Sequence, residues 1–108
     1  MILATSSGAG AEGTSYRSPG YAATKLAVVA VMEELYGALR DEQSPVRVGI
    51  AFPPLTATRL SGDPANMKFV EQYLNSQGVP AVVVEPEPVA EMILDGIKRD
   101  RFFIRKSA

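Results

Sequence analysis

The sequence predicts an α/β fold, in which a Rossmann-like parallel sheet of about three strands is flanked by about three helices. Short apolar runs alternate along the chain with longer segments whose apolar residues recur every 3.6 residues. Segments rich in Gly, Ser and Pro separate these runs. Alternation of this kind is typical of consecutive crossover units, which lay their strands parallel with right-handed connections.

The first half of the chain predicts a strand, a loop, a helix and a second strand. Residues 1–5 are an apolar run that ends in a small polar residue, as buried parallel strands do. Residues 6–18 are rich in Gly and Ser and predict a loop. Helical periodicity then runs from Tyr21 to about Arg40. Residues 46–52 predict the second strand, which ends at Pro53-Pro54 because neither proline can donate to a ladder.

The second half predicts a lid, a helix and a last strand. Residues 55–78 begin as a polar loop and continue as an amphipathic segment at about 65–74, which we expect to be a lid. Acids and prolines at 85–88 favour the start of a helix, whose apolar stripe is Val89, Met92, Ile93 and Ile97. Residues 101–104 predict a short strand. Four lid residues either line a ligand cavity or pack on their own domain: Met67, Phe69, Val70 and Leu74.

Composition limits the chemistry and the partners. A chain of 108 residues is long enough for one domain. Its net charge of -1, without a basic run, argues against nucleic acid as a partner. The absence of Cys and His excludes disulfides, thiolate metal sites and imidazole bases, so we expect no metal. No apolar run reaches the roughly 20 residues that span a bilayer, and we expect a cytoplasmic protein without membrane contact.

One constellation carries chemistry: Tyr21 and Lys25, preceded by a Ser6-Ser7 pair. Residues four apart on a helix lie on one face, so the ammonium and the phenol are neighbours. A nearby ammonium favours the phenolate form, which makes Tyr21 a usable general acid or base. From the helix alone, the alternative is a surface tyrosine packed on a lysine stem.

Three motifs in order resemble the C-terminal, catalytic half of a short-chain dehydrogenase/reductase. They are LATSSGAG at 3–10, YAATK at 21–25 and IAFPPLTAT at 50–58. The resemblance implies that residues 1–108 are the catalytic half of an NAD(P)-binding Rossmann domain, with residues 55–78 as its substrate loop. It implies carbonyl–alcohol interconversion by hydride transfer on a small-molecule substrate, with a tyrosine as acid and base.

The resemblance also implies roles for the catalytic residues. Ser7 corresponds to the serine that hydrogen-bonds the substrate oxygen, and Ser6 is the neighbouring alternative. Tyr21 corresponds to the proton donor. Lys25 corresponds to the lysine that holds the nicotinamide ribose and biases the tyrosine toward ionisation.

Residues 53–58 correspond to the segment that flanks the nicotinamide of NAD or NADP. The expected cofactor contacts, besides Tyr21 and Lys25, are Pro53, Pro54, Leu55, Thr56 and Thr58. Both threonines fall where main-chain and hydroxyl groups contact the carboxamide and the phosphate. The family usually has Pro-Gly at 53–54, so Pro54 is a departure that removes an N–H from this loop.

The glycine-rich turn that holds the pyrophosphate in the family has no counterpart here. Residues 8–13 do spell GxGxxG, but residues 14–20 contain Pro, Gly and hydroxyl residues and predict no helix behind it. We therefore assign this string to the loop of the catalytic serine.

A second hypothesis is a non-enzymatic or inactive truncated fragment that acts only through association. In either case we expect a homo-oligomer or association with the missing half, because a three-stranded remnant leaves a sheet edge unpaired.

Overall fold

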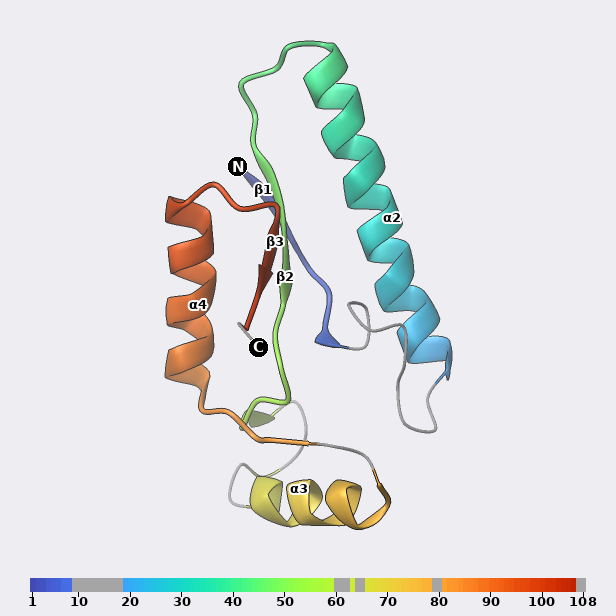
Figure 1. Cartoon of the computed structure of the whole chain (residues 1–108), viewed down its shortest axis with the longest axis vertical. Coiled ribbons are helices and arrows are strands. Elements are labelled where there is room, and N and C mark those ends of the chain that lie inside the picture. Colours follow the sequence, from blue (N-terminus) through green and yellow to red (C-terminus); the bar gives the residue numbers. More distant parts are fainter. Residues whose placement is uncertain (9–18, 60–62, 64–65, 79–80, 107–108) are drawn as a thin grey trace.

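Three parallel strands form the centre of the structure, a computed structural model that describes residues 1–8, 19–59, 63, 66–78 and 81–106. The strands are β1 (Ile2–Thr5), β2 (Val48–Phe52) and β3 (Phe103–Arg105), in the spatial order β1-β2-β3. The named helices are α2 (Pro19–Asp41), α3 (Met67–Ser76) and α4 (Pro86–Lys98) (Figure 1). This arrangement confirms the predicted fold class.

Parallel pairing brings the carboxyl ends of the strands to one edge of the sheet. β1 pairs with β2 from Ile2 opposite Val48 to Thr5 opposite Ala51, and β2 pairs with β3 in the same direction. Figure 1 shows that α2 and α4 both begin at this edge and run back along the sheet, while α3 lies across it. The carboxyl edge of an open parallel sheet is where such folds bind ligands.

The two faces of the sheet are covered by different helices. On one face Met32 of α2 packs in a core cluster with Val48, Ile50 and Phe52. Side chains alternate along a strand, so Ala51 points to the other face together with its register partner Ile104. Ile104 is buried there against Gly96 of α4, which makes three layers, as Figure 1 shows.

The starts of β2 and β3 each lie two residues later than predicted, because local hydrogen bonds engage the residues before them; the start of β1 and the end of β3 differ from the prediction by one residue. β2 begins at Val48 rather than at residue 46, since the Val46 N–H donates to the Ser44 hydroxyl at 3.2 Å. β3 begins at Phe103 rather than at residue 101, because the Arg101 N–H donates to the Gly96 carbonyl and closes α4. Neither shift changes the order of the elements.

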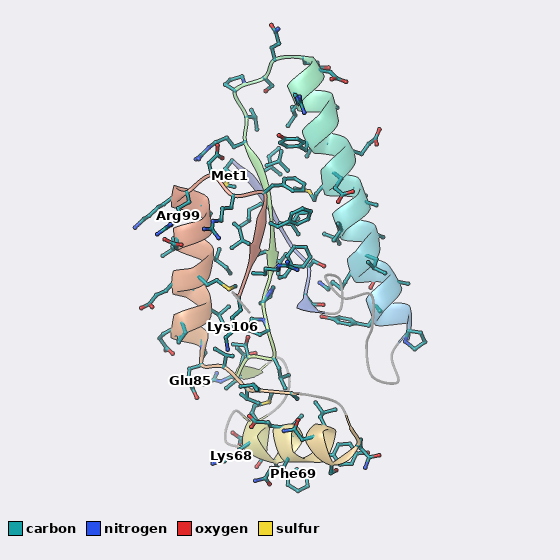
Figure 2. The ribbon with its side chains drawn as sticks, in the orientation of Figure 1. Met1, Lys68, Phe69, Glu85, Arg99 and Lys106 are labelled. Carbon is teal, nitrogen blue, oxygen red and sulfur yellow. The ribbon has the colours of Figure 1, made fainter. Side chains whose placement is uncertain are left out.

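The segment expected to be a lid contains α3, and its apolar residues separate into two kinds. Met67 is 1% exposed and packs inside its own domain, as one of the two predicted alternatives required. Phe69 is 72% exposed, and Figure 2 shows it pointing away from the rest of the molecule. None of the described helices has both the length and the apolar character to cross a membrane.

Replacement of Gly96 by alanine tests the close packing of α4 on β3. A Cβ at this position would lie 2.6 Å from the Ile104 Cγ2 atom. Overpacking of this kind costs about 1–3 kcal/mol, against a gain in helix propensity of about 1 kcal/mol. We expect Gly96→Ala to lower the free energy of unfolding by about 1 kcal/mol in urea denaturation.

Gly37→Ala is the matched control, because Gly37 is also helical and a Cβ there meets no atom within 4 Å. This variant should be stabilised by up to about 1 kcal/mol. Equal stabilisation by both substitutions would contradict the packing described for Gly96.

Candidate functional site

A cavity of about 610 Å³ opens at the carboxyl edge of the sheet. Its walls come from the segments that follow β1 and β2 and from the first turns of α2 and α4. All eight site residues expected from the sequence line it: Ser7, Tyr21, Lys25, Pro53, Pro54, Leu55, Thr56 and Thr58. Three segments that are far apart in the chain therefore meet around one space.

The ladder between β1 and β2 continues past both strands and forms one wall. The Ser6 N–H donates to the Ala51 carbonyl at 2.8 Å, and the Gly8 N–H donates to the Pro53 carbonyl at 3.3 Å. Ser7 lies between these two bonds. It is therefore held alongside Pro53 by backbone pairing, which is independent of its own side chain.

The two serines have different environments. Ser6 is 2% exposed, and its hydroxyl donates to the Lys25 carbonyl at 2.9 Å. Its only proton is thus engaged inside the protein. Ser7 is half-buried beside the cavity. Both serines line the cavity, and Ser7 is the more exposed of the two alternatives left by the sequence.

Tyr21 and Lys25 share one face of α2 above the cavity. The Lys25 Nζ atom lies 5.7 Å from the centre of the Tyr21 ring and donates to the Thr5 carbonyl at 3.4 Å. An ammonium over an aromatic face is attracted by the ring quadrupole. The positive charge is therefore held between the end of β1 and the phenol.

Tyr21 remains accessible to a ligand. It is 47% exposed, while Ala22 beside it is buried. Ala22 has a small side chain, which allows the first turn of α2 to approach its neighbours closely. The first turn of α2 therefore packs through Ala22 and leaves the Tyr21 phenol exposed.

The loop after β2 is held in place from both sides. The Thr56 hydroxyl donates to the Pro54 carbonyl at 2.7 Å, which closes a local turn. Thr56 also forms a parallel bridge with Val84, in which the Ala57 N–H donates to the Val84 carbonyl and the Val84 N–H donates to the Leu55 carbonyl. The loop is thus ordered although Pro54 has no N–H to offer.

Helix α4 supplies a wall of the cavity that the sequence analysis did not assign to the site. The lining residues on this helix are apolar: Pro86, Val89, Ala90 and Ile93. The apolar stripe that predicts α4 includes Val89 and Ile93, but a stripe does not say which residues face a cavity and which face the sheet. Thr5, the last residue of β1, and Gly8 also line the cavity; both belong to the first motif, which by itself did not indicate that they face this space.

The cavity combines a phenol, an ammonium and hydroxyl groups with the apolar surface of two prolines and Leu55. Of the GxGxxG string only Gly8 belongs to the described residues, and residues 9–18 lie outside them. Within the described part of the chain, no three His, Cys, Asp or Glu residues gather in a way that could hold a metal ion.

The chain was compared with protein-family models, with curated proteins and with solved structures, and no match was found in any of the three.

The bridge between Thr56 and Val84 can be tested by removing one N–H. Val84→Pro cannot donate to the Leu55 carbonyl, and Val84→Ala keeps this bond while it also shortens the side chain. We expect Val84→Pro to be less stable than Val84→Ala by about 1–3 kcal/mol in urea denaturation. Hydrogen exchange at the Ala57 amide should be faster in the proline variant alone. Equal exchange in both variants would show that the bridge does not hold this loop.

Proposed function

We propose that this chain is the catalytic half of an NAD(P)-dependent oxidoreductase of the short-chain dehydrogenase/reductase type, which interconverts a carbonyl and an alcohol. One observation carries the proposal. The eight residues singled out in three separate motifs line a single cavity at the carboxyl edge of a parallel sheet. Any parallel sheet brings the ends of β1 and β2 and the start of α2 to one edge, so the support lies in which groups meet there: a phenol, an ammonium and several hydroxyls beside an apolar surface.

Each part of the cavity has a task in this proposal. Lys25, with its ammonium beside Tyr21, would hold the nicotinamide ribose. Pro53, Pro54 and Leu55 offer an apolar surface for the nicotinamide ring. Thr56 and Thr58 lie next to this surface, where their main chain and hydroxyl groups can bind the polar parts of the cofactor.

Residues of this chain would stabilise the negative charge on the substrate oxygen and transfer a proton to it. A reduced nicotinamide cofactor, when bound, would supply the hydride that the carbonyl carbon of the substrate accepts. Ser7 donates a hydrogen bond to the carbonyl oxygen, where negative charge develops. Tyr21 gives its phenolic proton to this oxygen, and Lys25 stabilises the phenolate that remains. In the direction of alcohol oxidation, Tyr21 takes the proton back.

We also propose that the chain works in association, with a second copy or with a chain that carries the dinucleotide-binding half. β1 is an outer strand of the described sheet, and its residues Ile2 and Leu3, together with Met1 before them, are 36–44% exposed. Exposed apolar side chains on an outer strand favour pairing with a further strand.

Cofactor binding gives the first test. We expect titration of the chain with NADH and NADPH, followed by the fluorescence of the cofactor, to give saturable binding of at least one of them. Lys25→Ala should weaken this binding about tenfold or more, because a hydrogen bond from a charged group is worth about 1.5–3 kcal/mol. Tyr21→Phe should weaken it less, since a single neutral hydroxyl is removed.

Tyr73→Phe and Lys98→Ala are the matched controls, because they make the same chemical changes at residues that do not line the cavity. Both should bind the cofactor as the wild type does. If a folded wild-type chain binds neither cofactor, the enzymatic proposal fails, and the hypothesis of a non-enzymatic fragment is favoured.

Catalysis gives the second test. With para-nitrobenzaldehyde as a probe, the NADPH absorbance should fall in the presence of the chain. Tyr21→Phe should lower the rate by about 10²–10⁴-fold, because the proton donor is lost. Tyr36→Phe on the same helix should leave the rate unchanged, since Tyr36 packs on Phe102 away from the cavity. A rate that is insensitive to Tyr21 would contradict the assigned role.

A further inference from the structure

Ser6 is a buried polar residue at the edge of the candidate site. It is 2% exposed, and it is the one residue with a polar or charged side chain that is buried in the described part of the chain. Its N–H is bound to the Ala51 carbonyl on β2, and its hydroxyl is bound to the Lys25 carbonyl on α2. Ser6 therefore links the end of β1 to two other elements at once.

The hydroxyl bond reaches the helical turn that carries the candidate catalytic pair. Lys25 and Tyr21 lie one turn apart on α2, and Ser7 follows Ser6 directly in the chain. A second contact runs in parallel, from the Lys25 Nζ atom to the Thr5 carbonyl at 3.4 Å. The positions of Tyr21 and Lys25 relative to Ser7 thus depend on the contacts of the neighbouring residues Thr5 and Ser6.

The Lys25 carbonyl does not need the Ser6 hydroxyl as its hydrogen-bond partner. Lys25 lies inside α2, so its carbonyl accepts the helical hydrogen bond from the N–H four residues on. The Ser6 hydroxyl is a second, additional donor to the same oxygen. An alanine at this position would leave no buried polar group in need of a partner. What the hydroxyl adds is a directional contact between strand and helix.

We propose that Ser6 is a positioning residue of the candidate site. Its hydroxyl holds the turn from Tyr21 to Lys25 at a set distance from the end of β1, and thereby aligns the phenol and the ammonium with Ser7. The effect on cofactor binding rests on the proposed function, whereas the effect on the position of Tyr21 does not.

The test compares Ser6→Ala with Gly96→Ala, which lowers stability at a contact outside the cavity. Ser6→Ala should weaken NADPH binding about tenfold, within the coupling range of residues in one hydrogen-bond network. Gly96→Ala should bind NADPH as the wild type does. Ser6→Cys keeps a similar volume with a weak donor, so it should give a smaller loss in the same direction and serves if Ser6→Ala does not fold.

A double-mutant cycle with Lys25→Ala separates positioning from general destabilisation. If Ser6 acts through the Lys25 turn, Ser6→Ala should weaken binding much less in the Lys25→Ala background than in the wild type. Equal losses in both backgrounds would overturn the positioning role. So would an unchanged affinity in Ser6→Ala itself.

A second measurement needs no cofactor and keeps the inference testable if the wild type binds none. With ¹³Cζ-labelled tyrosine, Ser6→Ala should shift the Tyr21 resonance and leave that of Tyr73 unchanged, and Gly96→Ala should move neither. The Tyr21 signal is identified by its loss in Tyr21→Phe. An unmoved Tyr21 resonance in Ser6→Ala would refute the inference, whereas absent binding with a moved resonance would refute the proposed function alone.

Discussion

The parallel register between β1 and β2 is the constraint on which the site depends. Thr5 lies opposite Ala51, and the pairing continues beyond both strands through the N–H groups of Ser6 and Gly8. A shift of one residue would turn Ser7 to the opposite face and separate it from the loop after β2. The backbone ladder therefore sets the geometry of the cavity before any side chain contributes.

The helices bring functional side chains to the carboxyl edge, whose geometry the sheet defines. α2 begins at this edge and brings a phenol and an ammonium, while α4 begins beside it and brings an apolar wall. α2 and α4 have different roles because they cover different faces of the sheet. Residues of α2 pack in the core cluster with β2, whereas α4 meets β3 through Gly96 and Ile104. The cavity lies where both helices start.

The sequence by itself determined the class of fold and most of the element positions. Helical periodicity placed α2 and α4, because a 3.6-residue repeat is a local property of the chain. The prolines at 53–54 marked the end of β2, since a missing N–H ends a ladder whatever surrounds it. The motifs also named the eight residues that the structure brings to one cavity, although their proposed roles stay predictions.

Only the tertiary structure decided which serine is buried, which face of α4 lines the cavity and how the loop after β2 is held. Ser6 and Ser7 are chemically identical in the sequence, but in the structure Ser6 is buried and donates to a helix carbonyl 19 residues away, whereas Ser7 is half-buried. The bridge from Thr56 to Val84 likewise joins segments separated by α3. Such contacts depend on how distant elements pack against one another, and no local pattern of residues records them.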